Sequence, residues 1–474
     1  MPAFGKIGKI LRAALAISAG RGYLLNGGRH RRHMSPQANP KGENMHNVRD
    51  FGAVGDGVAK DTSAIQRAID AGGVAYLPPG EYLTGTLHLR SGGGLEIAPG
   101  AVLRGSPDPA DYDENCCPQN RVFASEMVSG AHLLVACEVH DVVIRGGGRI
   151  HGNREAFFGG AEDPRRPGKF LRPEWRPGQM LFFCESSDIS ITDVELCESP
   201  YWSCFLHGCE QVNIRGLRIA NHRMTPNGDG IDIDCCRFVT VSDCRIDTGD
   251  DCITLRANSA PLKKPRACEK IAVTNCILSS PCQAIRVGVG DGTIRDAVFG
   301  NLVIHHTRSG IQLVSRYSSS SPGVTIENLL FGDILMECRR PLAVLSDVRG
   351  ARGEEIKPIR GVVFRNIRAA GDRSCFFEAN RRGDIADITL DGVDLTCRGG
   401  DDIVDGDDLP YGEFGVKNSP AAFHLKHVEN CSFHRVRVRW ENGASPLWKY
   451  ALRAENSAPP EISECRFDRD VRLD

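Results

Sequence analysis

Short apolar runs recur along the chain from about Leu95, and Gly, Asn or Asp separates one run from the next. Runs of this length that alternate apolar and polar residues are typical of β-strands. Aligned on one another, they give two inward columns of apolar residues, with steps of 22 to 32 residues. The first column is Cys204, Ile231, Ile253, Ile285 and Ile311; the second is Leu206, Ile233, Leu255, Val287 and Leu313.

A further apolar column follows the first strand of each unit. It consists of Ile191, Ile214, Val241, Val273, Phe299, Ile326 and Phe364. Two residues later stand small or turn-forming residues, namely Asp193, Gly216, Asp243, Asn275, Asn301, Asn328 and Asn366. One like residue per coil is typical of a parallel β-helix, because a single coil cannot bury its apolar face alone. The sequence therefore predicts an all-β protein of this architecture.

The segment before these columns predicts a cap at the N-terminal end. A strand and a Gly-rich turn begin near Val48, and Asp61 or Thr62 then starts a short helix. The helical spacing is carried by Ile65, Ala68 and Ile69. We expect residues 1–46 to be a basic, disordered extension and residues 47–474 to form a single β-helix domain.

Composition restricts the partners and the compartment. The formal net charge is −2 over 474 residues, which gives no reason to expect a nucleic-acid partner. The 19 cysteines lie mostly within strand runs and predict reduced core residues. Residues 11–20 are a short apolar run that Arg12 interrupts, and no run is long enough to span a membrane. We expect a cytoplasmic monomer, with secretion through a divergent signal as the alternative.

Acidic residues precede two neighbouring strand runs. An offset of 22 residues places Asp229 on Asp251, with Asp250 beside the pair. Turn formation is the simpler explanation of such residues. The outward columns, however, read Asp229, Asp251, Gln283, Ser309; then Asp232, Thr254, Arg286, Gln312; then Asp234, Arg256, Gly288, Val314. Rungs lie about 4.8 Å apart, so the paired carboxylates raise each other's proton affinity, as a hydrolase that deprotonates water requires.

The chain resembles glycoside hydrolase family 28, the polygalacturonase family, over about residues 47–440. The resemblance rests on DFGAVGDG with YLPPGEYLTG, on SPYWSCFLHGCEQVNI, and on PNGDGIDID with DCRIDTGDDCITLR. The family places Asn-Thr-Asp before one strand and Gly/Gln-Asp-Asp before the next. Here these are Asn227–Gly228–Asp229 and Gly249–Asp250–Asp251. The resemblance implies a right-handed, pectin-lyase-like solenoid with a short N-terminal capping helix.

The same resemblance implies roles for individual residues. Asp250 would be the general acid, while Asp229 and Asp251 would hold and deprotonate the attacking water, with inversion at the anomeric carbon. No metal or other cofactor is expected, and the partner is an oligosaccharide or polysaccharide. The expected substrate-binding residues are Asn227, Gln283, Arg286, Arg256, Gln312 and His222.

Two family motifs are replaced. The Gly-His-Gly motif falls on Cys282–Gln283–Ala284, and the Arg-x-Lys motif that binds the substrate carboxylate falls on Gln312–Leu313–Val314. Arg286, with Arg256 and Arg316 nearby, could supply positive charge instead. If Arg286 does so, the enzyme still prefers a uronate. If it does not, the sugar at the scissile bond is neutral or differently placed, which is the version we favour.

The function predicted is an inverting glycoside hydrolase that cleaves a pectin-derived or related oligosaccharide with altered recognition. One alternative is a β-helix polysaccharide lyase, in which the three aspartates would ligate Ca²⁺ through oxygen. Another is a non-catalytic carbohydrate-binding or structural β-helix.

Overall fold

The computed structural model describes residues 44–120, 126–317, 321, 323–347, 356–400, 419–441 and 445–474. The described residues belong to one compact unit, Asn44–Asp474. A basic extension was predicted for residues 1–46, and residues 1–43 of it lie outside the described part of the chain. Met45–Asn47 form the first strand, β1. No helix among the described residues is both long and apolar enough to cross a membrane.

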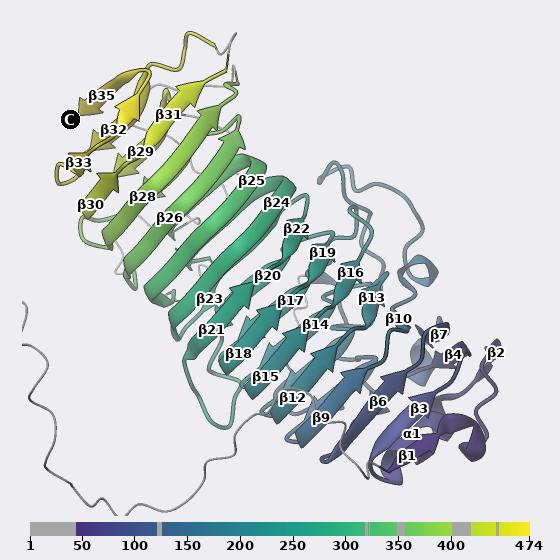
Figure 1. The fold of residues 1–474 in the computed structure, drawn as a ribbon. Helices are drawn as coiled ribbons and strands as arrows, with labels where there is room; N and C mark the ends of the chain where they lie inside the picture. The colour runs from purple at the N-terminus through teal and green to yellow at the C-terminus, as the bar shows by residue number, and fades with distance from the viewer. Residues whose placement is uncertain are drawn as a thin grey trace, which may run out of the picture. The chain divides into compact units, whose positions relative to one another are not determined.

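The unit is a right-handed parallel β-helix, as predicted, in which all the ladders between named strands are parallel (Figure 1). The strands form three faces, and four long strands run from one face into the next.

The first face contains β1, β3 (Val74–Leu77), β6 (Gly93–Ile97), β9 (His140–Arg145), β12 (Ser187–Thr192), β15 (Glu210–Arg215), β18 (Arg237–Ser242), β21 (Cys268–Thr274), β30 (Val428–His434) and β33 (Glu461–Ser463). The second contains β2 (Asp56–Lys60), β4 (Gly80–Thr84), β7 (Ala101–Gly105), β10 (Arg149–His151), β13 (Glu195–Cys197), β16 (Arg218–Ala220), β19 (Arg245–Asp247), β22 (Ile277–Ser279), β31 (Arg437–Trp440) and β34 (Arg466–Phe467). The third contains β5 (Leu87–His88), β8 (Leu134–Cys137), β11 (Leu181–Cys184), β14 (Cys204–His207), β17 (Ile231–Asp234), β20 (Ile253–Ala257), β23 (Gln283–Gly290), β27 (Cys375–Glu378), β29 (Ala421–Lys426), β32 (Tyr450–Glu455) and β35 (Asp470–Leu473). The long strands are β24 (Thr293–Arg316), β25 (Thr325–Asp347), β26 (Ile359–Gly371) and β28 (Ile385–Cys397).

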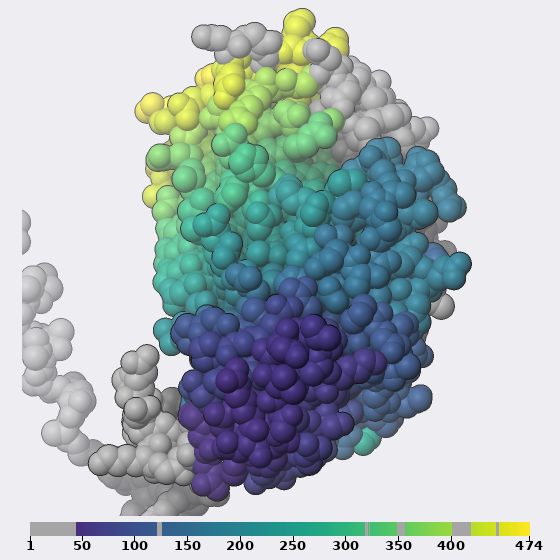
Figure 2. Space-filling model, turned by 90° about the vertical axis from the view of Figure 1, so that its right-hand side faces the viewer, coloured from purple at the N-terminus to yellow at the C-terminus, as the bar shows by residue number. Residues whose placement is uncertain are grey.

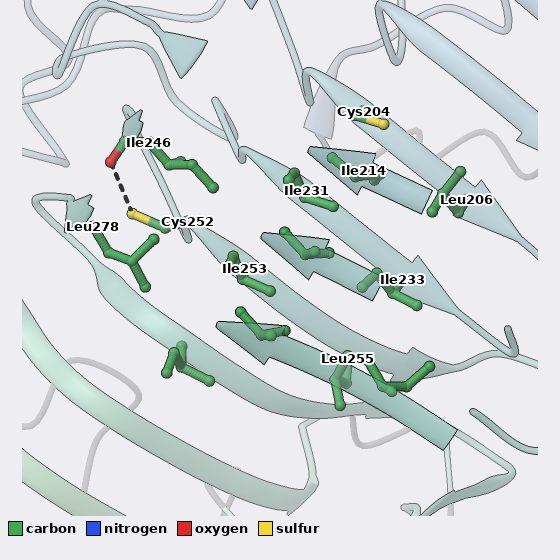
Figure 3. Close-up of a cluster of buried hydrophobic side chains, with 14 of the residues drawn as sticks. Cys204, Leu206, Ile214, Ile231, Ile233, Ile246, Cys252, Ile253, Leu255 and Leu278 are labelled. Atoms are coloured by element: carbon green, nitrogen blue, oxygen red, sulfur yellow. Dashed lines mark hydrogen bonds between the residues drawn. The ribbon is translucent and has the colours of Figure 1, made fainter. Parts of the chain in front are cut away.

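The two inward columns of the third face are confirmed by the strand register. Ile231 pairs with Cys204 on one side and with Ile253 on the other, and the ladder continues to Ile285 and Ile311. Figure 3 shows Cys204, Ile231 and Ile253 one above the other in the interior, beside Leu206 and Leu255 of the second column. The cysteines on these strands fill core positions, and all 19 cysteines are free thiols.

The prediction for the further apolar column, which precedes a corner of each coil, is wrong at one position. The ladder runs from Phe299 to Phe331 and on to Phe364, so Phe331 takes the place predicted for Ile326. The corner residue is accordingly Asp333 and not Asn328. Asn328 lies at the other corner, and both residues have a φ of 56°. Both corners of a coil need a residue with a left-handed backbone conformation, which favours the same residue types. The sequence pattern of one corner therefore resembles that of the other.

The N-terminal cap is formed by helix α1 (Thr62–Asp70), beside the 3-10 turn η1 (Val48–Phe51); η2 (Pro109–Asp111) and η4 (Arg154–Ala156) are further short turns. The predicted apolar face of α1 is buried. Asp61 occupies the N-cap position, but its carboxylate accepts hydrogen bonds from Val54 N (2.7 Å) and Gly55 N (3.0 Å) and does not cap the helix. Asp61 therefore fixes the Gly-rich turn to the start of the helix.

An aromatic ladder stabilises the middle of the solenoid. The rings of Phe299 and Phe331 stack at 4.9 Å between centroids, and those of Phe331 and Phe364 at 5.4 Å. Phe331 is fully buried. Phe331→Ala should therefore lower the free energy of unfolding by about 3–5 kcal/mol, measured by urea denaturation. The control is Leu335→Ala on the same strand, where the side chain is 54% exposed and the expected change is within about 0.5 kcal/mol. Equal losses would contradict the ladder's role.

Candidate active site

Three carboxylates meet where the third face begins. Because Ile231 pairs with Ile253, Asp229 lies one rung from Asp251, and Gly230 N donates to Asp251 O at 2.9 Å. Asp250 belongs to the same turn, and its Oδ2 accepts from Asn227 N at 3.3 Å. The outward columns through Asp229 and Asp232 thus follow the predicted register. The third column is interrupted by a bulge after Leu255.

Two arginines predicted to bind substrate donate to carboxylates of this region, and substrate binding by them stays a prediction. Arg256 donates from Nε to Asp232 Oδ1 at 2.7 Å, and its Nη2 lies 3.5 Å from Asp229 Oδ2. Arg286 donates from Nη1 to Asp251 Oδ2 at 3.1 Å. Both arginines are buried, at 7% and 8% exposure of the whole residue. Buried carboxylates need such partners, because an unpaired charge in the interior is strongly destabilising.

Asp229 is the most basic of the three carboxyl groups. Burial, and then the negative charges of Asp232 and the Asp250–Asp251 pair, raise its pKa well above the ordinary value. Its Oδ1 is buried and has no hydrogen-bond partner among the described residues. Burial also raises the pKa of Asp251, while Arg286 opposes the shift. A buried carboxylate oxygen with a raised pKa and no hydrogen-bond partner is suited to accept a proton from water.

Asp250 differs from the other two. Although burial by itself would raise its pKa, the Lys169 ammonium and a hydrogen bond from the Cys282 thiol hold that pKa below its ordinary value. Arg308 and Arg286 act in the same direction. In the protein without substrate, the first proton therefore goes to Asp229 and not to Asp250.

Lys169 comes from the connection between β10 and β11, which the sequence interpretation left without a role. We call residues 157–178 the strap. Lys169 Nζ donates to Gly249 O, next to Asp250, and Phe170 N donates to Met224 O at 2.8 Å. Figure 1 shows this connection projecting beside β13 and β16, and Figure 2 shows this part of the chain, in blue, as a bulge along one side. The strap thus brings a cation to the turn that carries Asp250 and Asp251.

Arg176 anchors the strap. Its side chain is fully buried and donates from Nη1 to Pro200 O (2.8 Å) and Pro226 O (2.7 Å), and from Nη2 to Glu126 O (2.9 Å). Asn227 Oδ1 accepts from Arg172 at 2.9 Å and from Arg176 at 3.2 Å. Asn227 therefore positions the strap and Asp250 together. The clustered cations of residues 165–176 were the sequence signal for this role, but nothing in the repeat pattern tied them to Asp250.

The remaining predicted binding residues lie around the same turn. With its amide oriented to satisfy its neighbours, Gln283 donates to Asp251 Oδ1 and accepts from Arg308 Nη2 at 3.0 Å. Gln312 lies next to Gln283, one rung beyond Arg286. The His222 ring lies 4.8 Å from that of Phe170, and its Nδ1 accepts from Met224 N at 3.2 Å. Substrate binding by these residues stays a prediction.

Asp250, Asp251 and Cys282 offer potential metal ligands within 4.8 Å of one another. Ca²⁺ prefers oxygen ligands, and burial raises the pKa of the Cys282 thiol to about 12, so this donor set is poorly matched to a hard cation.

A hollow of about 530 Å³ lies beside the segment that follows β22. Pro281, next to Cys282, lines it, together with Arg308 and Arg339. Pro281 directly follows Ser280, whose hydroxyl donates to Asp250 O, but none of the three carboxylates lines the hollow.

Residues 120–408 match the family model described as "Glycosyl hydrolases family 28", and residues 45–93 match "Rhamnogalacturonase A/epimerase, pectate lyase-like". The chain is 27% identical over 284 residues, 56% of its own length, to a probable polygalacturonase of Vitis vinifera. Among solved structures, an exopolygalacturonase of Thermotoga maritima has a TM-score of 0.65 at 20% identity and covers 85% of this chain and 93% of its own. A family 28 exopolygalacturonase of Yersinia enterocolitica has a TM-score of 0.62 at 18% identity, covering 91% of this chain and 78% of its own.

The chain belongs to family 28 of the glycosyl hydrolases, as the resemblance predicted. The aligned region spans about half the length of the first curated relatives, 55% and 44% of their chains.

The buried carboxyl of Asp232 generates a stability prediction. Folding raises its pKa from 3.8 to about 6, chiefly by burial, although Arg256 opposes the shift. A raised carboxyl pKa means that its favourable contribution is complete below about pH 4 and is lost as the pH rises through about 6. Asp232→Asn cannot ionise and should remove this loss, on the order of 3 kcal/mol, measured by urea denaturation at pH 4 and pH 7.

The matched control is Asp188→Asn at an exposed position, which should leave the pH dependence unchanged. If Asp232→Asn lost as much stability between the two pH values as the unmodified protein, Asp232 would not be the titrating group.

Proposed function

We propose that the protein is an inverting glycoside hydrolase acting on O-glycosidic bonds of a pectin-derived or related oligosaccharide. The observation that carries the proposal is the stacking of Asp229 on Asp251 with Asp250 beside them, all three held by the register of β17 and β20. A non-catalytic solenoid gains nothing from concentrating like charges in its interior, where each buried charge costs stability. Family membership supports the same class of chemistry.

In the proposed reaction, Asp250 protonates the oxygen of the leaving sugar as the glycosidic C–O bond breaks. Asp229 and Asp251 orient a water and take its proton, and the water oxygen bonds to the anomeric carbon from the opposite face. Inverting enzymes leave about 6.5–9.5 Å between acid and base to admit this water. Asp251 accepts hydrogen bonds from Arg286 and from Gln283 N (3.2 Å), which suits it to hold the water, whereas Asp229 suits the proton-accepting role.

Asp229 has a raised pKa and Asp250 a lowered one, so the protonation state that the reaction needs is the less populated one in the free protein. Catalysis needs the proton on Asp250 and a charge on Asp229, but the free protein favours the opposite arrangement. A bound sugar that separates Lys169 from Asp250 would restore the required order. The turnover rate is then coupled to how well the substrate displaces or neutralises the cations around Asp250.

The substrate is proposed to be recognised differently from the family's pattern. Gln312 and Val314 replace the cations of the Arg-x-Lys motif, and a neutral amide does not substitute for a guanidinium in binding a carboxylate. Arg286 donates to Asp251, which speaks against a second role for it in holding a uronate. We therefore expect plain polygalacturonic acid to be a poor substrate beside rhamnogalacturonan fragments or neutral oligosaccharides.

The decisive test is a screen of purified protein against these three substrate classes, with product anomers read by proton NMR. Asp250→Asn should lower turnover by about 10²–10⁴-fold on ordinary substrates and much less on substrates with good leaving groups, because those need no protonation. Asp229→Asn and Asp251→Asn are the matched variants and should lose activity on both.

An unsaturated product that absorbs in the near ultraviolet, dependent on Ca²⁺, would identify a lyase instead. Binding without turnover would identify a non-catalytic protein.

Lys169 gives a prediction for the pH profile. Since Asp250 has the lower pKa of the pair, it governs the acidic limb of kcat/KM and Asp229 governs the alkaline limb. Lys169→Met removes the positive charge that lowers the pKa of Asp250, so the acidic limb should move to higher pH. Arg165→Met, at an exposed position of the strap, is the control. Movement of the alkaline limb alone would show that the order of the two pKa values is reversed.

A further inference from the structure

Three thiols meet at the ends of two neighbouring strands of the third face. Cys137 ends β8 and pairs in the strand register with Cys184, which ends β11. The connection between β7 and β8 brings a third thiol to them, because Cys117 Sγ lies 2.8 Å from Cys137 Sγ. The proposed hydrolysis uses none of these residues.

Cys117 is the most acidic thiol of the three. Hydrogen bonds from the thiols of Cys137 and Cys184 lower the pKa of Cys117, although burial opposes this change. The same contacts raise the pKa of Cys184, which is fully buried. The cluster therefore favours one thiolate, at Cys117, that accepts hydrogen bonds from two thiols. Because oxidants react with the thiolate and not with the thiol, oxidation is expected to begin at Cys117.

Cys117 and Cys137 are also the pair best placed to form a disulfide. The S–S bond is about 2.05 Å long, so the two sulfur atoms have to approach each other by only about 0.8 Å. Cys137 is half-buried and Cys117 is 5% exposed. Such limited access favours a small oxidant, of the hydroperoxide class.

The segment that carries Cys117 also supports the strap. Glu114 Oε1 accepts a hydrogen bond from Trp175 Nε1 of the strap at 2.8 Å, and the ring of Tyr112 lies 5.7 Å from the ring of Trp175. Cys117 follows Glu114 by three residues. A bond that fixes Cys117 therefore also restricts the side chains on which Trp175 rests.

Gln119 attaches the same segment to the solenoid. Its amide is buried and donates to Glu138 Oε1 at 2.9 Å and to Glu185 Oε2 at 2.8 Å. Glu138 directly follows Cys137, and Glu185 directly follows Cys184. In the thiol form, the described contacts between this segment and the ends of β8 and β11 are thus hydrogen bonds and packing, which open more readily than a covalent bond.

We propose that Cys117 and Cys137 form a redox-sensitive clasp, closed as a disulfide by a hydroperoxide, that fixes the strap to the solenoid. This inference goes beyond the proposed hydrolase function and does not depend on it. The Cys117 thiolate attacks one oxygen of hydrogen peroxide and becomes a sulfenic acid, while the other oxygen takes up a proton and leaves as water. The Cys137 sulfur then attacks Cys117 Sγ, and the hydroxyl group leaves with the Cys137 proton as a second water. Two thiols are thereby oxidised to one disulfide, and the peroxide is reduced to water.

The first test compares the full chain after limiting hydrogen peroxide with the same chain in dithiothreitol. Oxidation should remove two thiols, measured by thiol titration of the denatured protein, and peptide mass spectrometry should find Cys117 linked to Cys137. Dithiothreitol should restore both thiols. A bond between other cysteines, or no bond in the folded protein, would overturn the assignment of the clasp.

The second test measures the strap by limited proteolysis. Within the strap trypsin can cleave only after Arg165 and Lys169, because the other arginines, Arg166, Arg172 and Arg176, precede prolines. Cleavage at the two sites should be slower by about fivefold or more in the oxidised protein, because the closed clasp lowers the population of the open strap. A Cys117–Cys137 bond that leaves the cleavage rate unchanged would refute its action on the strap.

Variants separate the clasp from general effects of oxidation. Cys117→Ala and Cys137→Ala should each abolish the difference in cleavage rate between the oxidised and the reduced protein, and Cys117→Ser replaces the first variant if that one fails to fold. Cys116→Ala is the matched control, since Cys116 is a half-buried neighbour whose pKa is raised to about 12, chiefly by burial. It should retain the full difference. Loss of the difference in Cys116→Ala, with Cys117→Ser unaffected, would assign the effect to the wrong thiol and overturn the proposal.

Discussion

Parallel stacking of coils in register constrains everything else in this molecule. Each coil places its side chains one rung from the corresponding side chains of the next, so inward positions must be apolar and corners must accept left-handed residues. The same register forces Asp229 against Asp251. Like charges at this spacing are unfavourable, and the site exists because Arg256 and Arg286, from the neighbouring rungs, donate into it.

The charges around the site give chemically identical carboxyl groups different pKa values. Burial without a full set of partners makes Asp229 basic, whereas cations from the strap and from Arg308 make Asp250 acidic. The protein without substrate therefore holds its proton on Asp229, the proposed proton acceptor, and not on Asp250, the proposed proton donor. In the proposed reaction, substrate binding has to reverse this arrangement, which would couple recognition of the sugar to proton transfer.

The repeat made most of the fold predictable, because columns such as Ile231–Ile253 follow from the register of a single solenoid. Ile326 and Asn328 were misplaced because both corners of a coil select the same residue types, and only the ladder through Phe331 distinguishes them. The carboxylates could be predicted for the same reason as the core. Lys169 could not, since the strap is an insertion without a repeat, and its contact with Gly249 depends on how that insertion folds back.

Solenoids of this kind tend to fray from their ends, because each coil is stabilised only by its neighbours. Arg176 departs from this rule by binding carbonyl groups of Glu126, Pro200 and Pro226, which belong to different coils. Opening one of these coils therefore breaks bonds that belong to the others. Protection from amide hydrogen exchange should accordingly fall off toward both ends of the chain and be greatest across the coils that Arg176 joins, so the turn that carries Asp250 unfolds last.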